Sequence, residues 1–545
     1  MHKKQDARSQ RKRRDDESTI IKVIRHQRLN GLAWREKEYK MNFKKTLCSM
    51  LAILMLLSTV AVFASCGKSV ETPDVTLGEA NSEVEGSAVD NRFVGVDYDG
   101  REFRINTSNN SYDTIGTSNV FIEGTDSING ALVNDAVLER NLTVEELLGV
   151  DLVFTQLDVS WGGSTTEVRK LVQSGMDEYD LFINDCFDLG PLSIEGNFHN
   201  VMTEDSALDF DRPYWYKDYM ADLTFAEGYQ YLLAGDFFMD IIRSAHLILV
   251  NKYVYEEYIK RSPDELYDFV LNYEWTYDKL NELITDMYYD LDGNGYRTKG
   301  DLYGWIANFW WGATIPLVVS GNPTFIIRDE DGYPTWGLAE DSRADLITTA
   351  MSKLLNSEFA AVGIMGEERP LDGFVQNWAL FIDGQLGTLE NTTLRSMEND
   401  IGVLPYPMLM SSDEKYTTST HDITEIGAVL ITAPEDNMNF ITTVIEVLNR
   451  ETANILMPKY YDEELQVKCV DDPKSAAMID IIHDNFGNSF ITTFNNALGN
   501  TLLQTFTECA QTQRDFSTIW ATKKRSMNNI LKKQVSTFIS KNEID

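Results

Sequence analysis

One twelve-residue stretch has the residue types and spacing of a cation-binding loop. In 290–301, DLDGNGYRTKGD, side-chain oxygens stand at the first, third, fifth and twelfth places: Asp290, Asp292, Asn294 and Asp301. Gly295 at the sixth place permits a sharp bend, and Tyr296 at the seventh offers a backbone carbonyl. Asp301 is shorter than the Glu that such loops usually have. The spacing predicts a structural Ca²⁺ site, and an Asp/Gly-rich turn without an ion is the alternative.

Aromatic residues gather after a strand-like run in GWIANFWWG, at 304–312. Sugars present flat C–H faces and a rim of hydroxyls, so a sugar site needs aromatic plates together with amides or carboxylates. If the strand continues this far, Trp310 and Trp311 point in opposite directions and at least one can reach a ligand. Asn308, Trp310 and Trp311 have the residue types of such a site, and burial in a core is the alternative for each Trp.

No catalytic motif is present in the sequence. GxSxG, HExxH, GxxxxGK[ST] and CxxC patterns are all missing. Acidic residues are so abundant that a pair of carboxylates suited to a glycosidase would arise by chance. His199, His246, His421 and His483 are far apart in sequence, and we interpret each as structural. We therefore predict no catalytic residue, no required cofactor and no enzyme activity.

Composition restricts the partners and the redox chemistry. The chain has 48 Lys/Arg and 85 Asp/Glu, a net charge of −37, and residues 66–545 carry 33 basic and 79 acidic side chains. Such a surface repels nucleic acid and anionic lipid headgroups. Beyond residue 66, Cys186, Cys469 and Cys509 are an odd set without regular spacing, so buried thiols are expected rather than a disulfide scaffold.

An export signal precedes the acidic part of the chain. Residues 41–66, MNFKKTLCSMLAILMLLSTVAVFASC, have a short basic start, an apolar run and small residues before Cys66. This segment resembles a bacterial lipoprotein signal, which implies cleavage before Cys66 and lipidation of that cysteine; a retained membrane-spanning anchor is the alternative. Residues 1–40 are interpreted as a misassigned N-terminal extension, or else a nucleic-acid arm. Residues 66–91 are read as a flexible tether.

From residue 92 onward, strand-like and helix-like segments alternate. Residues 150–156 and 179–184 have strand composition, 167–174 is helical, and HLILVNK at 246–252 is a further strand. Thr276 is placed to cap a helix that follows it. This alternation predicts an α/β fold with crossover helices, in which ligands bind near the carboxyl ends of the strands.

The order of several short segments points to a known family. YDLFIN, HLILVNK, EWTYDKLNELI, WALFIDGQLGTLENT and DIGVLPYP follow one another as in extracellular solute-binding proteins (family 1, sugar-binding group) of bacterial ABC importers, which the chain resembles. The resemblance implies a two-lobe, periplasmic-binding-protein-like (type II) α/β fold with hinge-linked lobes. Lobe 1 would span 92–245, with 385–431 returning to it. Lobe 2 would span 246–384, with C-terminal helices in 432–545 packing mainly on it.

The same resemblance implies that Asn308, Trp310 and Trp311 contact the sugar, and it implies further ligand contacts. Asp185 and Asp188 fit a polar loop of the first lobe, although a loop cap is the alternative role for Asp185. The remaining positions lie before the hinge strand, at the second crossing, and late in the chain: Arg243, Ser244, Thr392 and Phe486.

Together these features predict a monomeric, lipid-anchored binding protein on the outer face of the cell membrane. It would capture a carbohydrate, specifically an oligosaccharide, in an interlobe cleft by hinge closure and pass it to ABC permease subunits. The alternatives are an exported hydrolase or lyase that acts on carbohydrates, and a binding protein for another solute such as a peptide.

Overall fold

The computed structural model describes residues 91–108, 119–125, 127–128, 130–157, 162–307, 310–338, 342–364, 370–461 and 473–542. They belong to one compact unit, Val89–Asp545. The predicted extension, signal peptide, lipidation site at Cys66 and most of the tether lie outside the described residues, as do Asn308 and Cys469. Among the residues described, no helix combines the length and apolarity needed to span a bilayer.

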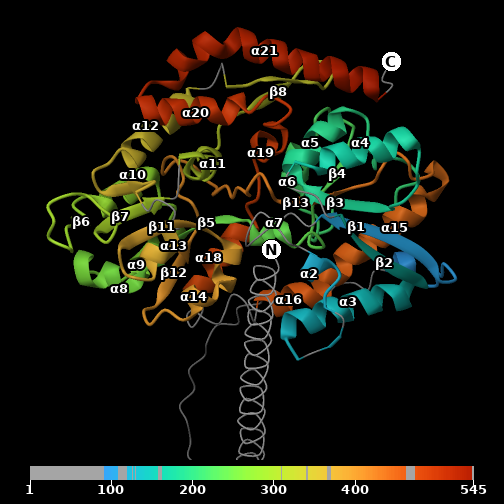
Figure 1. Cartoon of the computed structure of the whole chain (residues 1–545), viewed down its shortest axis with the longest axis horizontal. Coiled ribbons are helices and arrows are strands. Elements are labelled where there is room, and N and C mark those ends of the chain that lie inside the picture. Colours follow the sequence, from blue (N-terminus) through green and yellow to red (C-terminus); the bar gives the residue numbers. More distant parts are fainter. Residues whose placement is uncertain are drawn as a thin grey trace, which may run out of the picture. The chain divides into compact units, whose positions relative to one another are not determined.

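The first sheet has five strands in the order β2-β1-β3-β13-β4 (Figure 1). Its strands are β1 (Arg101–Ser108), β2 (Val150–Leu157), β3 (Leu181–Asp185), β4 (Leu232–Leu233) and β13 (Glu425–Ala428). β1, β2 and β3 are parallel, whereas β13 runs antiparallel to both β3 and β4. The helices of this part are α2 (Asn119–Ile122), α3 (Leu132–Leu148), α4 (Ser164–Ser174), α5 (Cys186–Ile194) and α6 (Lys217–Asp222). We call this sheet and its helices the first lobe.

The second sheet has the order β10-β7-β11-β5-β12, and β6 pairs with β7. Its strands are β5 (His246–Asn251), β6 (Tyr288–Tyr289), β7 (Leu302–Ala307), β10 (Ala360–Val362), β11 (Ala379–Gln385) and β12 (Ile401–Leu404). β5 is antiparallel to both of its neighbours. The surrounding helices are α8 (Lys252–Val254), α9 (Asp264–Leu271), α10 (Tyr277–Ile284), α11 (Trp310–Ser320), α12 (Arg343–Leu355), α13 (Pro370–Phe374) and α14 (Thr392–Arg395). This sheet and its helices form the second lobe.

The chain crosses between the two sheets in opposite directions. It leaves β4, passes through α7 (Asp240–Arg243) and enters β5 at His246; it returns from β12 to β13 through residues 405–424. The two crossings are joined where the backbone N–H of His246 donates to the carbonyl of Ser419 at 2.9 Å. The predicted α/β fold with two lobes linked by crossing segments is therefore confirmed.

Local sequence accounts for several of these elements. The predicted strands at 179–184 and 246–252 are β3 and β5, and both are buried along their whole length, as expected of strands covered on two faces. Thr276 caps α10 as predicted, accepting from the backbone N–H of Lys279. Gly149 ends α3 in a left-handed conformation with φ of 62°. Cys186 and Cys509 are free and buried, as expected.

The segment 385–431, expected to return to the first lobe, divides between the lobes. β12 pairs with β5 in the second sheet, and β13 lies between β3 and β4 in the first. The chain thus remains in the second lobe until residue 404, because the apolar strand Ile401–Leu404 completes that sheet beside β5.

The helices after residue 432, expected mainly on the second lobe, also contact both lobes. α15 (Met438–Glu451), α16 (Met457–Tyr460) and the π-helical turn Thr452–Leu456 pack on α3 or near it, and α19 (Phe490–Phe494) packs on α5. α18 (Pro473–His483) packs on α9 and β12, and α20 (Thr501–Thr512) on α11 and α12. α21 (Phe516–Lys541) contacts α12 and α5, and so reaches elements of both lobes (Figure 1).

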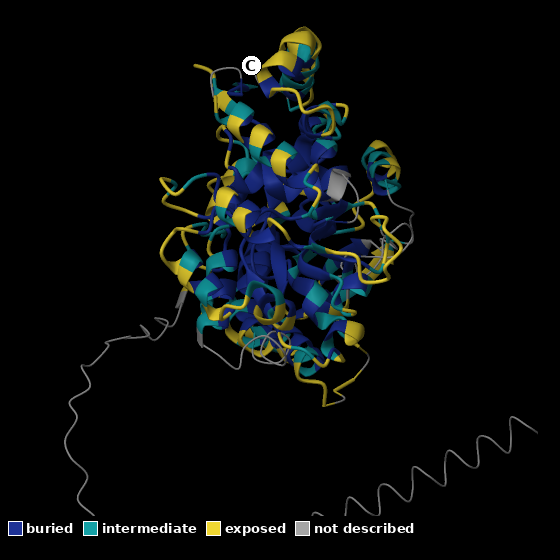
Figure 2. Ribbon diagram, turned by 90° about the vertical axis from the view of Figure 1, so that its left-hand side faces the viewer, coloured by how far each residue is buried: buried dark blue, intermediate teal, exposed yellow. Residues whose placement is uncertain are grey.

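The remaining elements are short: η1 (Asn91–Phe93), the π-helical turn η2 (Tyr255–Ile259), η3 (Leu386–Glu390), η4 (Glu435–Asn437) and the hairpin of β8 (Ile326–Arg328) with β9 (Pro334–Trp336). Buried residues fill the sheets and the helix faces turned toward them, and exposed residues lie on the outer helices and loops (Figure 2).

Candidate functional site

The carboxyl ends of strands from both sheets meet at the crossing segments. In the first sheet β3 ends at Asp185, which pairs with Glu425, the first residue of β13. In the second sheet β11 ends at Gln385, which pairs with His246, the first residue of β5. The ring centroids of His246 and His421 are 6.0 Å apart. Because ligands of open α/β sheets bind at carboxyl ends, this junction is where a binding site is expected.

Three polar side chains of the second lobe lie together near this junction. Trp305 on β7 is in register with Phe381 on β11, and Asp383 lies two residues further along β11 on the same face. Tyr406 follows the end of β12, and its ring centroid is 6.4 Å from that of Trp305 and 6.5 Å from that of His246. We call Trp305, Asp383 and Tyr406 the hinge triad.

The hinge triad has buried polar atoms without partners. Trp305 Nε1, Asp383 Oδ1 and the Tyr406 hydroxyl are buried and form no hydrogen bond to any described residue. Burial raises the pKa of Asp383 to about 7, and burial followed by the nearby Asp383 carboxylate raises the pKa of Tyr406. Buried polar groups are almost always hydrogen-bonded, so an N–H donor, a hydroxyl and a carboxylate oxygen in one place make the hinge triad a candidate for binding a polar group.

Carboxylates line the first-lobe side of the junction. Asp185 caps α5 by accepting from the backbone N–H of Asp188 at 2.8 Å, and Asp240 accepts from the backbone N–H of Glu425 at 3.0 Å. Burial raises the pKa of Asp185, and raises those of Asp188 and Asp240 to about 6. These carboxylates are protonated more readily than exposed ones because they lie in a low-dielectric region.

Two histidines link the acidic side to the hinge triad. His421 Nδ1 lies 2.8 Å from Asp422 Oδ1, and His246 Nδ1 lies 2.9 Å from Ser419 Oγ. Burial alone would lower the pKa of His421, but the Asp422 carboxylate outweighs it and the pKa is raised. Burial and the neighbouring His421 lower the pKa of His246 to about 3. At neutral pH His246 is therefore an uncharged hydrogen-bonding group.

The structure places Asp185 and Asp188 at the start of α5. Asp185 has the helix-capping role that was the alternative for it. Asp188 is also buried, and its Oδ2 has no partner among the described residues. This geometry makes Asp188 the better placed of the two to accept a hydrogen bond from a ligand.

Arg243 and Ser244 hold the first crossing in place. Arg243 forms a bidentate ion pair with Glu390, at 2.9 Å and 3.0 Å, and its guanidinium lies 4.4 Å from the Phe121 ring centroid. Glu390 also accepts from the Tyr460 hydroxyl at 2.9 Å. Ser244 Oγ lies 2.6 Å from Thr424 Oγ1, which ties the two crossing segments together.

The other predicted contacts are dispersed. Thr392 begins α14 and is exposed. Phe486 is buried with its ring centroid 5.2 Å from that of Tyr216, and pairs with Thr418 of the second crossing. β7 ends at Ala307 and α11 begins at Trp310, so the strand alternation considered for Trp310 and Trp311 does not apply. Both residues are placed at the start of α11, and Asn308 is outside the described residues.

Sequence reasoning missed the hinge triad. Asp383 interrupts the apolar run of WALFIDG, and a carboxylate inside a buried strand is a signal that could have been used. Tyr406 stands between two prolines just after a strand, in VLPYP. Both residues lie in segments that carry the family resemblance, but the sequence does not show that they meet Trp305, because the triad forms only when β7, β11 and the end of β12 come together.

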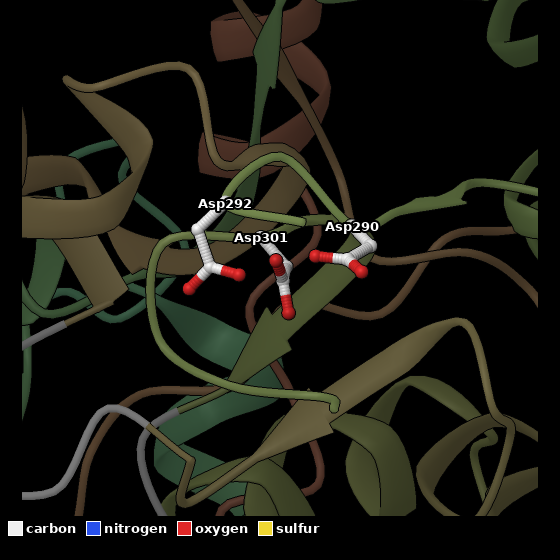
Figure 3. A group of neighbouring side chains, drawn as sticks. All are labelled: Asp290, Asp292 and Asp301. Atoms are coloured by element: carbon white, nitrogen blue, oxygen red, sulfur yellow. The ribbon is translucent and has the colours of Figure 1, made fainter. Parts of the chain in front are cut away.

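The acidic loop at 290–301 has converging oxygens. One oxygen from each of Asp290, Asp292 and Asp301 lies within 4.8 Å of the others (Figure 3). Asp290 accepts from the backbone N–H groups of Gly293 and Gly295, each at 2.8 Å, and these contacts lower its pKa. Gly295 has a φ of +77°, the bend that the spacing required. The donor set suits a hard cation such as Ca²⁺, which prefers carboxylate and carbonyl oxygens.

The other predicted ligands follow the same turn. Asn294 Oδ1 accepts from the backbone N–H of Tyr296 at 2.6 Å, and the Tyr296 carbonyl accepts from the Tyr288 hydroxyl at 3.3 Å. Asp301 is buried and accepts from the backbone N–H groups of Leu291 and Thr298, at 3.1 Å and 2.8 Å. The same hydrogen bonds hold the loop as a turn. The geometry therefore agrees both with a Ca²⁺ site and with an Asp/Gly-rich turn that binds no ion.

Comparison with known proteins gives the fold. No family model and no curated protein matches the sequence. Among solved structures, the chain is similar to an ABC transporter solute-binding protein from Thermotoga lettingae bound with α-D-tagatose, with a TM-score of 0.50 and 12% identity over 79% of this chain and 100% of that one. The chain has the fold of an ABC-transporter solute-binding protein. The predicted type II periplasmic-binding-protein-like architecture is confirmed.

Two further solved structures are similar at a lower level. One is an ABC substrate-binding protein from Listeria monocytogenes in complex with cycloalternan, with a TM-score of 0.48, 12% identity, and 80% and 99% of the two chains covered. The other is the GacH receptor of Streptomyces glaucescens in complex with acarbose, with a TM-score of 0.47, 12% identity, and 79% and 99% covered. At this identity, the likeness to solute-binding proteins concerns the fold alone.

Proposed function

We propose that this chain is the substrate-binding component of an ABC importer, and that it captures a carbohydrate between its two lobes and releases it unaltered. The observation that carries the proposal is the hinge triad of Trp305, Asp383 and Tyr406. It supplies a buried N–H donor, a hydroxyl and a carboxylate oxygen beside aromatic rings, at the junction of the strand ends. This is the combination that the hydroxyls and C–H faces of a sugar require.

Capture proceeds by movement of the lobes about the two crossings. A ligand that touches the hinge triad from one lobe and Asp188 from the other gains both sets of contacts only when the lobes approach. Such differential binding shifts the equilibrium toward the closed form without any covalent step. The predicted contacts Trp310 and Trp311 would add stacking area, and an oligosaccharide would use more of it than a monosaccharide.

We also propose that the protein is a monomer attached to the outer face of the cell membrane through a lipid on Cys66. The attachment is supported by the basic start, apolar run and small residues of 41–66. The acidic stretch that follows has no helical or strand periodicity and would serve as the tether. ABC permease subunits in the same membrane would then receive the ligand.

The loop at 290–301 is proposed to bind Ca²⁺ as a structural ion. Asp290, Asp292, Asn294 and Asp301 would supply side-chain oxygens, and Tyr296 a backbone carbonyl. The loop connects β6 and β7, so the ion would stiffen the turn before the strand that carries Trp305.

The proposal is tested with residues 67–545 and a panel of mono- and oligosaccharides, with peptides as a second panel. We expect a carbohydrate to raise the melting temperature and to be recovered unchanged by chromatography. A shorter product would instead identify a hydrolase or lyase. A melting shift with peptides and with no carbohydrate would contradict the sugar assignment while leaving a binding function in place.

A further inference from the structure

The last helix of the fold has an unusual charge composition. α21 (Phe516–Lys541) contains six basic residues and no acidic one. In the chain after residue 65, by contrast, 79 acidic residues outnumber 33 basic ones. Positive charge that is scarce elsewhere is therefore concentrated on one element.

The cations of α21 lie on the exposed part of its surface. The inner face is apolar, with buried residues at helical spacing: Phe516, Ile519, Trp520, Met527, Leu531 and Phe538. Five basic residues are exposed: Lys524, Arg525, Lys532, Lys533 and Lys541. None of these five forms an ion pair with a described residue, whereas the half-buried Lys523 pairs with Glu508 at 2.7 Å. We call the five exposed residues the basic stripe.

The basic stripe is held rigidly. Near the start of α21, the Ser517 backbone N–H donates to Asp345 at 2.8 Å, and the ring centroids of Trp520 and Trp336 are 5.6 Å apart. Near its end, Phe538 is buried, and its ring centroid is 5.4 Å from that of Phe225. The helix has neither glycine nor proline and is about 39 Å long at 1.5 Å per residue. α21 runs along the edge of the described body, beyond α20 (Figure 1), and the residues of the basic stripe are spaced along its length.

We propose that the basic stripe docks on the anionic lipid headgroups of the membrane. The inference rests on the proposed attachment through Cys66, which would hold the body near a membrane without fixing its orientation. The net charge of the chain argues against contact with an anionic surface, but charges interact over only about 8 Å at physiological ionic strength. A membrane against α21 therefore meets the stripe first, and each cation near the surface favours binding by about fivefold. Docking would set which side of the body faces the membrane.

The experiment uses the unlipidated chain 67–545, so that the stripe is tested without the anchor. Sedimentation is measured with vesicles of phosphatidylcholine alone and of equal parts phosphatidylcholine and phosphatidylglycerol. We expect binding to the anionic vesicles only, and loss of binding in high salt. A quadruple variant should bind at least about tenfold more weakly; its changes are Lys524→Gln, Arg525→Gln, Lys532→Gln and Lys533→Gln.

A matched variant controls for net charge. It removes four exposed lysines elsewhere: Lys170→Gln, Lys217→Gln, Lys260→Gln and Lys353→Gln. It loses the same charge as the stripe variant and should bind anionic vesicles as the unaltered chain does. Equal losses in the two variants, or no binding of the unaltered chain to anionic vesicles, would overturn the proposal. No sugar is present, so these outcomes are independent of whether the proposed ligand is correct.

Discussion

Removal of the Tyr406 hydroxyl should move stability and ligand affinity in opposite directions. In Tyr406→Phe the ring remains beside Trp305 and His246, so no cavity opens. The hydroxyl that disappears is buried and has no partner among the described residues. If a sugar hydroxyl is the partner of this group, the substitution removes an unpaired polar group from the unliganded protein and raises its free energy of unfolding. The same substitution removes a hydrogen bond from the complex and lowers the affinity for the ligand.

The expected sizes follow from the cost of unpaired polar groups. A buried group without a hydrogen bond costs about 1–3 kcal/mol, so the free energy of unfolding should rise, by about 1 kcal/mol if the lower value applies. A neutral hydrogen bond to a ligand contributes about 0.5–1.5 kcal/mol, so affinity for the carbohydrate should fall by roughly two- to twelvefold.

Both quantities can be measured on one preparation, by urea unfolding without ligand and by calorimetric titration with the carbohydrate found in the panel. Tyr277→Phe is the matched control, because the Tyr277 hydroxyl is buried and paired, with the Leu317 carbonyl and with Ser320 Oγ at 3.0 Å. This control should lose about 1 kcal/mol of stability. If Tyr406→Phe loses stability as the control does, the Tyr406 hydroxyl of the unaltered protein has a hydrogen-bond partner without ligand. The hinge triad would then not be a site with unpaired polar groups available to a ligand.

Three further outcomes are expected. Because the pKa of Asp383 is raised from 3.8 to about 7, its contribution to stability is present below about pH 4 and is lost as pH rises through about 7; Asp383→Asn should flatten this pH dependence in urea unfolding. Ca²⁺ should raise the melting temperature and EDTA lower it, with no response in Asp290→Asn; an equal response in that variant would contradict the site. Phe538→Ala should lower the free energy of unfolding by about 3–5 kcal/mol, because the side chain is buried. Amide hydrogen exchange should become faster in 530–542 and stay slow in β5; equally faster exchange in both would refute a local role.

The sequence predicted the elements whose signals are local. Apolar runs gave β3 and β5, and Thr276 marked the start of α10. The order of segments then favoured the two-lobe fold that the structure has. The convergence of oxygens in the loop at 290–301 was also predictable, because all of these oxygens lie within twelve consecutive residues.

What the sequence could not supply are contacts between distant segments. Residues 401–404 and 425–428 look alike as short apolar strands, yet one joins the second sheet and the other the first. Asp383 and Tyr406 are distant from Trp305 in sequence, and only the pairing of β11 with β7 and β5 brings them together. The alternation considered for Trp310 and Trp311 required a continuing strand, but β7 ends at Ala307 and α11 begins at Trp310, so the condition is not met.

The place of β13 in the first sheet has a consequence for how the chain folds. β13 lies between β3 and β4, although about two hundred and forty residues separate it from β3. The first sheet therefore cannot be completed until residue 428 has been synthesised. Such non-local strand pairing makes folding slow. The export proposed above would benefit from this delay, because premature collapse of the leading half of the chain would block passage through an export channel.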